Sequence, residues 1–502
     1  MIRRLLRRSP AALVMLALAP AASAAHVGSP DVIFDGKAGP YDVRVIVRPP
    51  MVVPGLAEVV VRVVHGGATQ VLIRPVFWRA GVRGSPSPDR AKPVAGTADT
   101  YTGQLWLMAR GAYSVYVTVE GSAGSATVIV PVMSVATGRL GMTSGLGVLL
   151  VALGILLVAG LVTIAYAAAG ESLVEPGVAV DRRRRQRARV AAAVAAPVLA
   201  LLLLGGAKWW KNVDTLYQSR LYRPLATRAS ISHERARAEL RFEIVDSILR
   251  VFPLDPLVPE HGKLMHLFVV DSAHSTAFAH LHPIFDGKTT FSTAIPPLPP
   301  GRYQLFGDIT FETGQTRTLT GSVDLTRDDS ALAEAGKPAD ADDGWINGPG
   351  VQRRDRATTV DTLRDGSTME WLADSTSIGA GQETTLRFRV RDSIGALATL
   401  QPYLGMSAHA VIVRTDGSVF IHLHPAGTIS LAAQQMFAMR DRGDTTTGGR
   451  MRLVSDAART HEMPIAGEFA FPYVFPRSGP YRIWVQVRRS GHVLTGVFDV
   501  TA

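Results

Sequence analysis

Two long uncharged segments constrain this chain more than any other feature. Residues 140–170 contain no charged side chain, and residues 190–207 form a second uncharged run that ends at Lys208-Trp209-Trp210. A membrane-spanning helix needs about 20 consecutive apolar residues, and a pair of Trp rings suits the interface between membrane and water. We therefore predict transmembrane helices at 140–169 and 190–207, with the lipid bilayer as a partner.

The distribution of positive charge predicts the orientation of these helices. Six Arg residues fall between positions 182 and 189, inside a predicted loop at 170–189. Because positively charged loops remain cytoplasmic, we place this Arg-rich loop in the cytoplasm. The N- and C-terminal regions then lie on the extracytoplasmic, periplasmic side of a bacterial-type cytoplasmic membrane.

The distribution of the net charge along the chain also excludes a nucleic-acid-binding surface. The formal net charge is +11, of which four Arg in the first eight residues contribute +4 and the segment 171–189 contributes +3, so +4 remains for the rest of the chain. The basic character therefore belongs to membrane topology, and no nucleic-acid partner is expected.

The first 25 residues predict a secretory signal peptide. A basic stretch is followed by a short apolar stretch and then by Ala22-Ser23-Ala24-Ala25, which suits cleavage after Ala24 or Ala25. The alternative is an anchor helix that is not cleaved.

The segments outside the membrane predict a mainly β protein with a transmembrane helical hairpin. They are rich in Val, Thr, aromatic residues and Gly/Pro turns, in short alternating runs, which is typical of antiparallel β-sandwiches. We predict three immunoglobulin-like sandwich domains at 26–135, 230–327 and 366–502, and a polar linker at 328–365.

The last two of these domains form a tandem repeat. Four blocks recur in the same order: 240–246 resembles 386–392, 278–283 resembles 420–425, 300–306 resembles 478–484, and 319–325 resembles 494–500. Repeated blocks in a fixed order indicate duplication of one structural unit.

A hairpin in the third domain brings histidines together. Asp416-Gly417 separates two alternating runs, which is a strong two-residue hairpin signal. With these residues at the turn, His409 lies opposite His424, and His422 lies opposite Val411. Strand alternation then places all three His on one face, opposite an apolar core stripe.

The second domain repeats this arrangement around a longer turn. His266 is predicted to pair with His282 about a loop centred on His274, and His280 shares their face. Directly opposed Cβ atoms lie about 4.5–5.5 Å apart, which two ring nitrogens can bridge through one metal ion. We therefore predict a three-His metal site in each domain.

The absence of Cys limits which metal ions the predicted sites can bind. The chain has no Cys, which excludes disulfides, thiolate zinc sites and Cys nucleophiles. His ligands with nearby thioethers favour a copper ion, with zinc second. Met406 is the predicted sulfur ligand, and Met265 and Met463 lie near the motifs in the sequence. No acidic residue follows either His-Leu-His-Pro block at the position expected for a mixed carboxylate site.

The chain ends with an aromatic strand, then Ser490-Gly491-His492, then a final strand containing Gly496. This ending resembles the closing hairpin of the periplasmic copper-resistance CopC family. The general pattern also resembles YtkA-like and FixH-like envelope domains. The resemblance implies an immunoglobulin-like domain that handles copper, partly through a mature N-terminal His, which would be His26 if cleavage follows Ala25.

Three functions remain open from the sequence. The first is a membrane-anchored extracytoplasmic metal-binding protein for copper binding, sensing or delivery, with envelope proteins as possible partners. The second is a non-catalytic adhesive or scaffolding array, in which a ladder of His and Phe seals an interface between domains. The third is a three-His zinc enzyme, but no general base accompanies the His motifs at a defined spacing, so we do not expect an enzyme.

Overall fold

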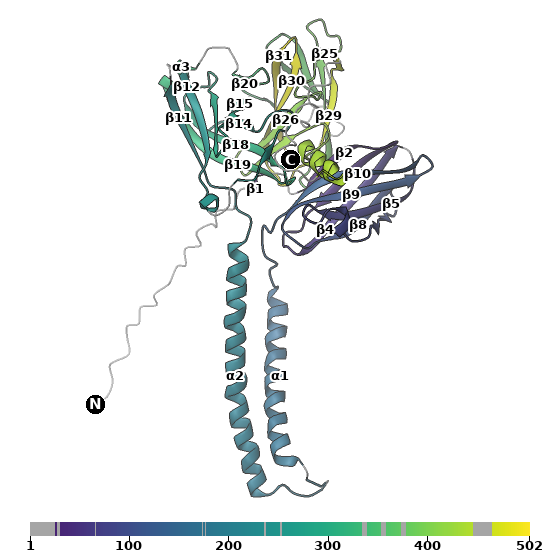
Figure 1. Ribbon diagram of the computed structural model, residues 1–502, viewed down its shortest axis with the longest axis vertical. Coiled ribbons are helices and arrows are strands. Elements are labelled where there is room, and N and C mark those ends of the chain that lie inside the picture. The colour runs from purple at the N-terminus through teal and green to yellow at the C-terminus, as the bar shows by residue number, and fades with distance from the viewer. Residues whose placement is uncertain are drawn as a thin grey trace, which may run out of the picture.

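The computed structural model places a β-rich head above a hairpin of two long helices (Figure 1). It describes residues 26–27, 31–65, 67–172, 174–175, 177–234, 237–250, 254–333, 339–352, 358–372, 378–444 and 464–502. The predicted signal peptide at 1–25 and Met463 lie outside these residues.

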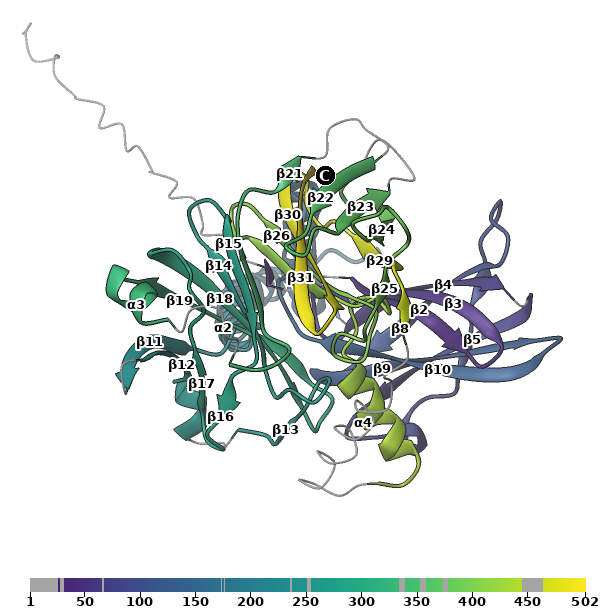
Figure 2. The same cartoon turned by 90° about the horizontal axis from the view of Figure 1, so that it is seen from above.

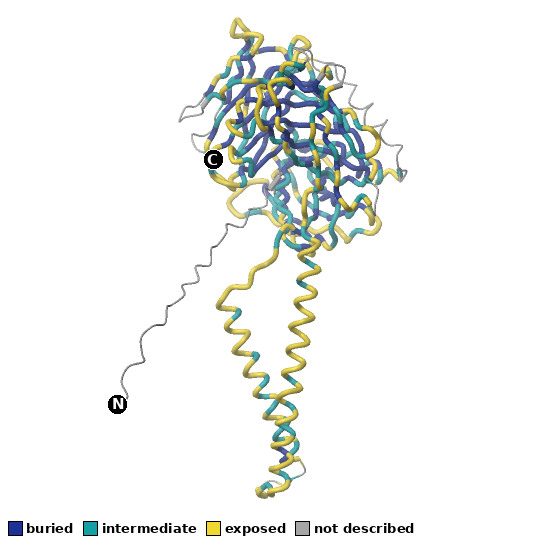
Figure 3. Tube along the Cα trace, turned by 90° about the vertical axis from the view of Figure 1, so that its left-hand side faces the viewer, coloured by how far each residue is buried: buried dark blue, intermediate teal, exposed yellow. Residues whose placement is uncertain are grey.

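The two helices are α1 (Ser144–Glu171) and α2 (Arg182–Ser219). Each begins at a side chain that caps it, since Thr143 accepts a hydrogen bond from the Leu146 N–H and Asp181 accepts one from the Arg184 N–H. Both helices are long and apolar enough to cross a membrane. Their apolar side chains are exposed along most of their length, unlike those of the head (Figure 3).

The Arg run belongs to a helix and not to the predicted loop. Helix α2 starts at Arg182 and includes all six of these Arg residues, so the connection between the helices is confined to residues 172–181. Arg and Ala are good helix formers, and the Asp181 cap lies directly before the run. Gly170 lets the helices approach closely, because a Cβ there would lie 3.0 Å from the Cβ of Ala188.

The first unit consists of two facing antiparallel sheets. Its sheets have the orders β2-β3-β4-β8-β7 and β10-β9-β5-β6. Alternate residues of both sheets enter one core that includes Val45, Val61 and Val117. The strands are β2 (Val32–Ala38), β3 (Tyr41–Arg48), β4 (Gly55–His65), β5 (Ala68–Phe77), β6 (Asp89–Arg90), β7 (Lys92–Pro93), β8 (Thr100–Leu107), β9 (Gly111–Gly121) and β10 (Gly124–Ser134), with a short 3-10 turn at Val82–Gly84.

The second unit has the same two-sheet plan. One sheet has the order β11-β12-β17-β16 and the other β13-β18-β14-β15-β20, with β19 paired to β18. The strands are β11 (Thr227–Glu234), β12 (Arg237–Ile244), β13 (Leu257–Val258), β14 (His266–Asp271), β15 (Ala277–Leu281), β16 (Ile284–Phe285), β17 (Thr290–Ala294), β18 (Gly301–Phe311), β19 (Thr316–Leu325) and β20 (Gly344–Asn347), with a 3-10 turn at Ser247–Arg250 and helix α3 (Arg327–Leu332).

The third unit repeats the second and adds helix α4 (Leu431–Asp441). Its sheets have the orders β22-β23-β24-β29 and β1-β27-β26-β30-β31-β21, and β25 pairs with β28. The strands are β21 (Val351–Gln352), β22 (Thr358–Thr362), β23 (Thr368–Leu372), β24 (Glu383–Arg391), β25 (Thr399–Leu400), β26 (His409–Arg414), β27 (Val419–Leu423), β28 (Ile465–Ala466), β29 (Glu468–Val474), β30 (Pro480–Arg489) and β31 (His492–Thr501).

Two predicted boundaries differ from the structure. The segment expected to be a polar linker contains β20, which pairs with β15 and extends the sheet of the second unit. The first strand, β1 (His26–Val27), lies outside the first unit and pairs in parallel with β27 of the third. In both cases a short segment satisfies its backbone groups at an exposed sheet edge.

The second and third units pack face to face, and the third lies between the other two (Figure 2). Strands β14 and β15 are buried on both faces: Leu267 enters the core of its own unit, whereas Phe268 enters a shared core with Phe420. Phe306 stacks on Phe420 with ring centroids 4.2 Å apart, and Phe278 stacks on Trp484 at 4.7 Å. The face that the sequence left unassigned is therefore an interface between the repeated units.

Candidate metal centre

Both predicted His hairpins have the predicted register. In the third unit Ala410 pairs with Leu423 and Val411 with His422, as a turn at Asp416-Gly417 requires. In the second unit Leu267 pairs with Leu281, and Phe268 pairs with His280. The six predicted histidines therefore lie on the face opposite the core of each unit.

Packing of the two units merges these six histidines into one cluster. The His266 and His422 ring centroids lie 5.3 Å apart across the interface, and those of His280 and His422 lie 5.9 Å apart. A seventh ring, His261, joins them at 5.1 Å from His424. We call the following residues the seven-His cluster: His261, His266, His280, His282, His409, His422 and His424.

One set of three rings belongs to the second unit. A nitrogen of each of His266, His280 and His282 lies within 4.8 Å of the others, which is a spacing that could hold a metal ion. We call this set group A. The hydrogen bonds on the outer side of each ring decide which nitrogen carries the proton.

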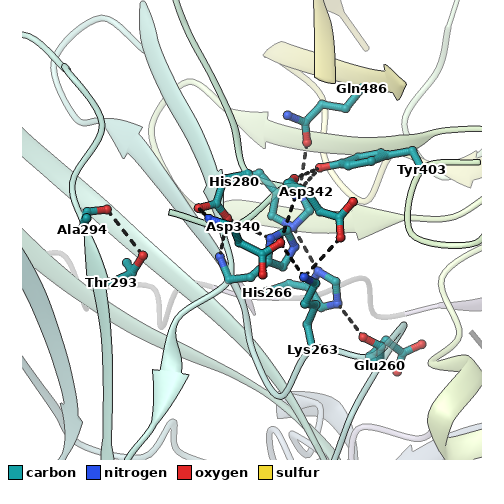
Figure 4. A network of polar contacts seen from close by, with 12 residues as sticks. Glu260, Lys263, His266, His280, Thr293, Ala294, Asp340, Asp342, Tyr403 and Gln486 are labelled. Carbon is teal, nitrogen blue, oxygen red and sulfur yellow. Dashed lines mark hydrogen bonds and ion pairs between the residues drawn. The ribbon is translucent and has the colours of Figure 1, made fainter. Parts of the chain in front are cut away.

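The outer hydrogen-bond partner of His266 is a backbone carbonyl group. Its Nε2–H donates to the Glu260 carbonyl oxygen at 3.1 Å, which leaves a lone pair on Nδ1 (Figure 4). His282 has its Nδ1 2.9 Å from Asp343 Oδ1, and both side chains are buried. We therefore assign its proton to Nδ1 and its lone pair to Nε2.

The partner of His280 comes from the third unit. Its Nδ1 lies 2.9 Å from Gln486 Oε1, and the Gln486 amide is oriented by donation from Nε2 to Thr495 Oγ1. The Tyr403 hydroxyl also lies 3.1 Å from this Nδ1, but it donates to the Asp342 carbonyl oxygen. Since both neighbours present an oxygen acceptor, the His280 proton lies on Nδ1 and the lone pair on Nε2.

These assignments make two lone pairs face each other. His266 Nδ1 and His280 Nε2 lie 3.0 Å apart. Either could donate to the other only by giving up its outer hydrogen bond. Two nitrogens bound to one ion at 2.0–2.1 Å lie about 3–3.4 Å apart for ordinary bond angles, so a cation between them satisfies both lone pairs.

The second set, group B, spans the two units. Nitrogens of His261, His409 and His424 also lie within 4.8 Å of one another. His424 donates from Nδ1 to the Ile429 carbonyl oxygen at 3.3 Å, so its Nε2 is free. Among the residues that the structure describes, His261 Nε2, His424 Nε2 and both nitrogens of His409 are buried without a hydrogen-bond partner.

His422 lies between the two groups. Its Nδ1 is 3.4 Å from Asp308 Oδ2 of the second unit, and its Nε2 has no hydrogen-bond partner within the described part of the chain. Asp308 is the cross-strand neighbour of His266, just as Gln486 is the cross-strand neighbour of His409. Each unit therefore supplies the outer partner for the central His of the other, as in a two-fold symmetric interface.

Burial keeps six of the seven rings neutral. Desolvation lowers the pKa of His261 and of His424 to about 4, and it lowers the pKa values of His266, His280, His409 and His422 well below their usual range. Neighbouring imidazoles add to the effect. Neutral imidazole is the form that binds metal ions.

Sequence reasoning missed two residues of this site. His261 was counted but not assigned, although Glu260-His261-Gly262 aligns with Tyr403-Leu404-Gly405 five residues before the first cluster His of each unit. Both His261 and Leu404 have positive φ, 54° and 52°. Asp343 comes from the segment predicted to be a linker, and it is the buried carboxylate that the expectation of no acidic partner overlooked.

The sulfur ligand is the weakest part of the sequence prediction. Met406 lies half-buried in a turn closed by backbone hydrogen bonds with Tyr403, and its counterpart in the second unit is Lys263. Met265 is buried in the core of its own unit, on the opposite face of the strand from His266. Met265 therefore faces away from the cluster, whereas Met406 stays a predicted ligand.

A third group, His282 with Asp340 and Asp343, also has the spacing of a cation site. The Lys263 ammonium already lies 2.5 Å from Asp340 Oδ1 and 3.2 Å from Asp342 Oδ2 (Figure 4). Lys263 therefore already balances negative charge in this acidic group. Asp343 of the same group orients the His282 ring from outside the cluster.

A family model described as "Domain of unknown function (DUF8832)" matches residues 226–326 and 359–502, which are the second and third units. No curated protein matches the chain in sequence. The tandem units thus have recognisable relatives, whose description names no activity.

Three solved structures are distantly similar. A tetra-tandem repeat in the extending region of a large adhesion protein is 11% identical, with 89% of this chain and 71% of that chain covered and a TM-score of 0.15. Dimeric latent PorU from Porphyromonas gingivalis is 8% identical, with 94% and 34% covered and a TM-score of 0.14. A putative membrane anchored protein from Corynebacterium diphtheriae is 9% identical, with 94% and 96% covered and a TM-score of 0.13. Likenesses at these TM-scores carry no argument about function.

Proposed function

We propose that this chain is a membrane-anchored, extracytoplasmic metal-binding protein that handles copper in the seven-His cluster. The single observation that carries the proposal is group A, where outer hydrogen bonds leave one nitrogen free on each of three buried rings whose nitrogens lie within 4.8 Å of one another. Hydrogen bonds that fix the tautomer of each His are the usual support of a metal ligand.

The composition of the cluster favours copper over other ions. All candidate ligands of groups A and B are imidazoles, and the two groups contain no carboxylate. Imidazole suits copper and zinc, whereas Mg²⁺ and Ca²⁺ require oxygen ligands. Copper stands highest in affinity for nitrogen ligands among the divalent first-row ions. Zinc is the second choice, and a zinc-bound water in a three-His site is the only route we see to an enzyme.

Metal analysis of the full-length protein in detergent tests this proposal. We expect the wild type to retain copper through gel filtration, and His266→Ala combined with His282→Ala to retain less, because group A is lost. His274→Ala combined with His492→Ala is the matched control, because both of these side chains are exposed. Equally low copper and zinc in the wild type and both variants would leave the scaffolding alternative.

One observation supports that alternative, a non-catalytic adhesive or scaffolding array. The aromatic pairs Phe306–Phe420 and Phe278–Trp484 stack at the same interface as the seven-His cluster. Such contacts stabilise docking by burial alone. In that case removal of the metal would leave the packing of the two units unchanged, whereas removal of the aromatic rings would separate them.

The orientation in the membrane forms part of the proposal. We place the three β units, as immunoglobulin-like sandwiches, on the extracytoplasmic side and the Arg run in the cytoplasm. The chain has no Cys, so single cysteines can report accessibility directly. In intact cells we expect a membrane-impermeant maleimide to label Ser122→Cys but not Gly177→Cys, both at exposed turns. Labelling of Gly177→Cys alone would reverse the topology.

A further inference from the structure

We infer that the seven-His cluster is a two-metal centre, with one ion in group A and a second in group B between the two units. This inference rests on the proposed function, since it concerns the number of ions and their placement at the same site. It follows from three features of the cluster: the separation of the donor sets, the origin of His261, and the surrounding carboxylates.

The two donor sets share no residue. Group A uses His266, His280 and His282, and group B uses His261, His409 and His424, with each set closed within 4.8 Å. One ion in group A would leave the free nitrogens of group B buried without partners, as they are among the described residues. Leaving several polar atoms unsatisfied in a buried interior is costly, and a second ion would pair with one nitrogen of each group B ring.

Group B depends on a break in the internal symmetry. The duplication gives each unit three cluster histidines, which alone would form two equivalent sites. His261 is the extra ring, and its counterpart in the third unit is Leu404, at the same left-handed position before the first strand. His261 reaches across the interface to His409 and His424, with ring centroids 5.4 and 5.1 Å away.

In group B, His261 takes the place beside His409 and His424 that the sequence predicted for His422. The His422 Nε2 is buried and unpartnered in the described structure, and its ring centroid lies 4.5 Å from His424 and 5.3 Å from His266. His422 lies outside both sets of nitrogens that close within 4.8 Å, so each ion has three ligands from the protein.

The charge around the cluster fits two ions of low charge. Three carboxylates lie close to the cluster: Asp343 at 2.9 Å from His282 Nδ1, Asp308 at 3.4 Å from His422 Nδ1, and Glu260 at 3.7 Å from His261 Nε2. Buried charge needs nearby opposite charge. Three carboxylates carry at most three negative charges, fewer than the four positive charges of two divalent ions, so we assign a pair of copper(I) ions.

Native mass spectrometry of the full-length chain, reconstituted with copper(I) under reducing conditions, counts the ions directly. We expect two copper ions per wild-type chain. His280→Ala should leave one ion in group B, and His424→Ala should leave one in group A. His492→Ala should keep two, because that side chain is exposed.

Each outcome separates this inference from the proposed function. No bound copper in the wild type overturns both. One ion in the wild type, lost in the cluster variants, keeps metal binding and overturns the two-metal centre. Two ions that both remain in His424→Ala overturn the assignment of group B. If a variant does not fold, the count of ions in the wild type still decides between one and two.

The placement of the second ion has its own readout. Because group B joins residues of both units, its ion should slow amide exchange in β20 and β31, which contact each other across the interface. We expect this protection in His280→Ala with copper and not in His424→Ala with copper. Equal protection in both variants would contradict a bridging ion.

Discussion

Acid should destabilise the metal-free protein through its buried imidazoles. Burial lowers the pKa of His424 from 6.5 to about 4. As pH falls below 6.5, the unfolded chain binds a proton at this position and the folded chain does not, so the free energy of unfolding decreases. Stability from this group is therefore complete above about pH 7 and is lost as pH falls toward 4.

The size of the effect follows from this window. A proton bound only by the unfolded state changes the free energy of unfolding by about 1.4 kcal/mol per pH unit. For a shift from 6.5 to about 4, the loss between pH 7.5 and pH 5 is about 2 kcal/mol for one imidazole. Other cluster rings titrate in the same direction, so the loss for the whole protein is larger.

Native-state hydrogen exchange measures this slope. We would follow the amides of β26 and β27 in a chelating buffer at pH 7.5, 6 and 5, with exchange corrected for its intrinsic pH dependence, because a chain of several units does not unfold in one step. His424→Gln should reduce the loss between pH 7.5 and 5 by about 2 kcal/mol relative to wild type. The exposed His492→Gln should not change it. A wild-type protein whose opening free energy is constant over this range would refute the reasoning.

Three further predictions concern single contacts. Phe420→Ala removes the ring stacked on Phe306 at 4.2 Å and should lower the opening free energy of β26 and β27 in native-state hydrogen exchange by about 3–5 kcal/mol; a loss below about 1 kcal/mol would mean that the interface does not hold the units together. Glu260→Ala removes the carboxylate that accepts from the first N–H groups of α4 and should cost about 1–2 kcal/mol, seen as faster amide exchange in α4 alone; unchanged exchange would contradict this cap. Asp343→Asn removes the charge behind His282 Nδ1 and should weaken copper affinity by about 10–100-fold in a competition titration, whereas an unchanged affinity would remove His282 from the ligand set.

Helix α4 links the centre to the first unit. Its N-terminus is held by Glu260, and Met436 and Phe437 pack against Trp78 and Val76 of the first unit. The Tyr116 hydroxyl also donates to Asp441 at the C-terminal end of the helix. The unit joined directly to α1 therefore contacts the loop that carries His261, through one continuous helix.

Local patterns accounted for the hairpins because hairpin register is a local property. The Asp416-Gly417 turn, with Gly417 at φ 71°, fixes which residues pair, and alternation then fixes which residues share a face. The two apolar helices were equally readable from length and composition. The Arg run was misassigned to a loop because its charge suggested topology, whereas its helix propensity was not weighed.

The burial of the cluster was partly visible in the same strands. Phe268, Val270 and Phe278 alternate with core residues of β14 and β15, so these strands are apolar on both faces. A strand apolar on both faces is buried on both faces. This pattern favours an interface between domains, which the sequence analysis kept only as an alternative.

By itself, the sequence determined the duplicated hairpins, the face that carries six of the histidines, and the absence of thiolate chemistry. Only the tertiary structure decided that the two His faces meet, that His261 completes a second group, and that Asp343, Asp308 and Gln486 orient the rings from outside. The physical reason is the distance along the chain over which each interaction acts. Turn type and strand alternation act over a few residues, whereas the docking of two units depends on the shapes of whole surfaces formed from residues more than a hundred positions apart.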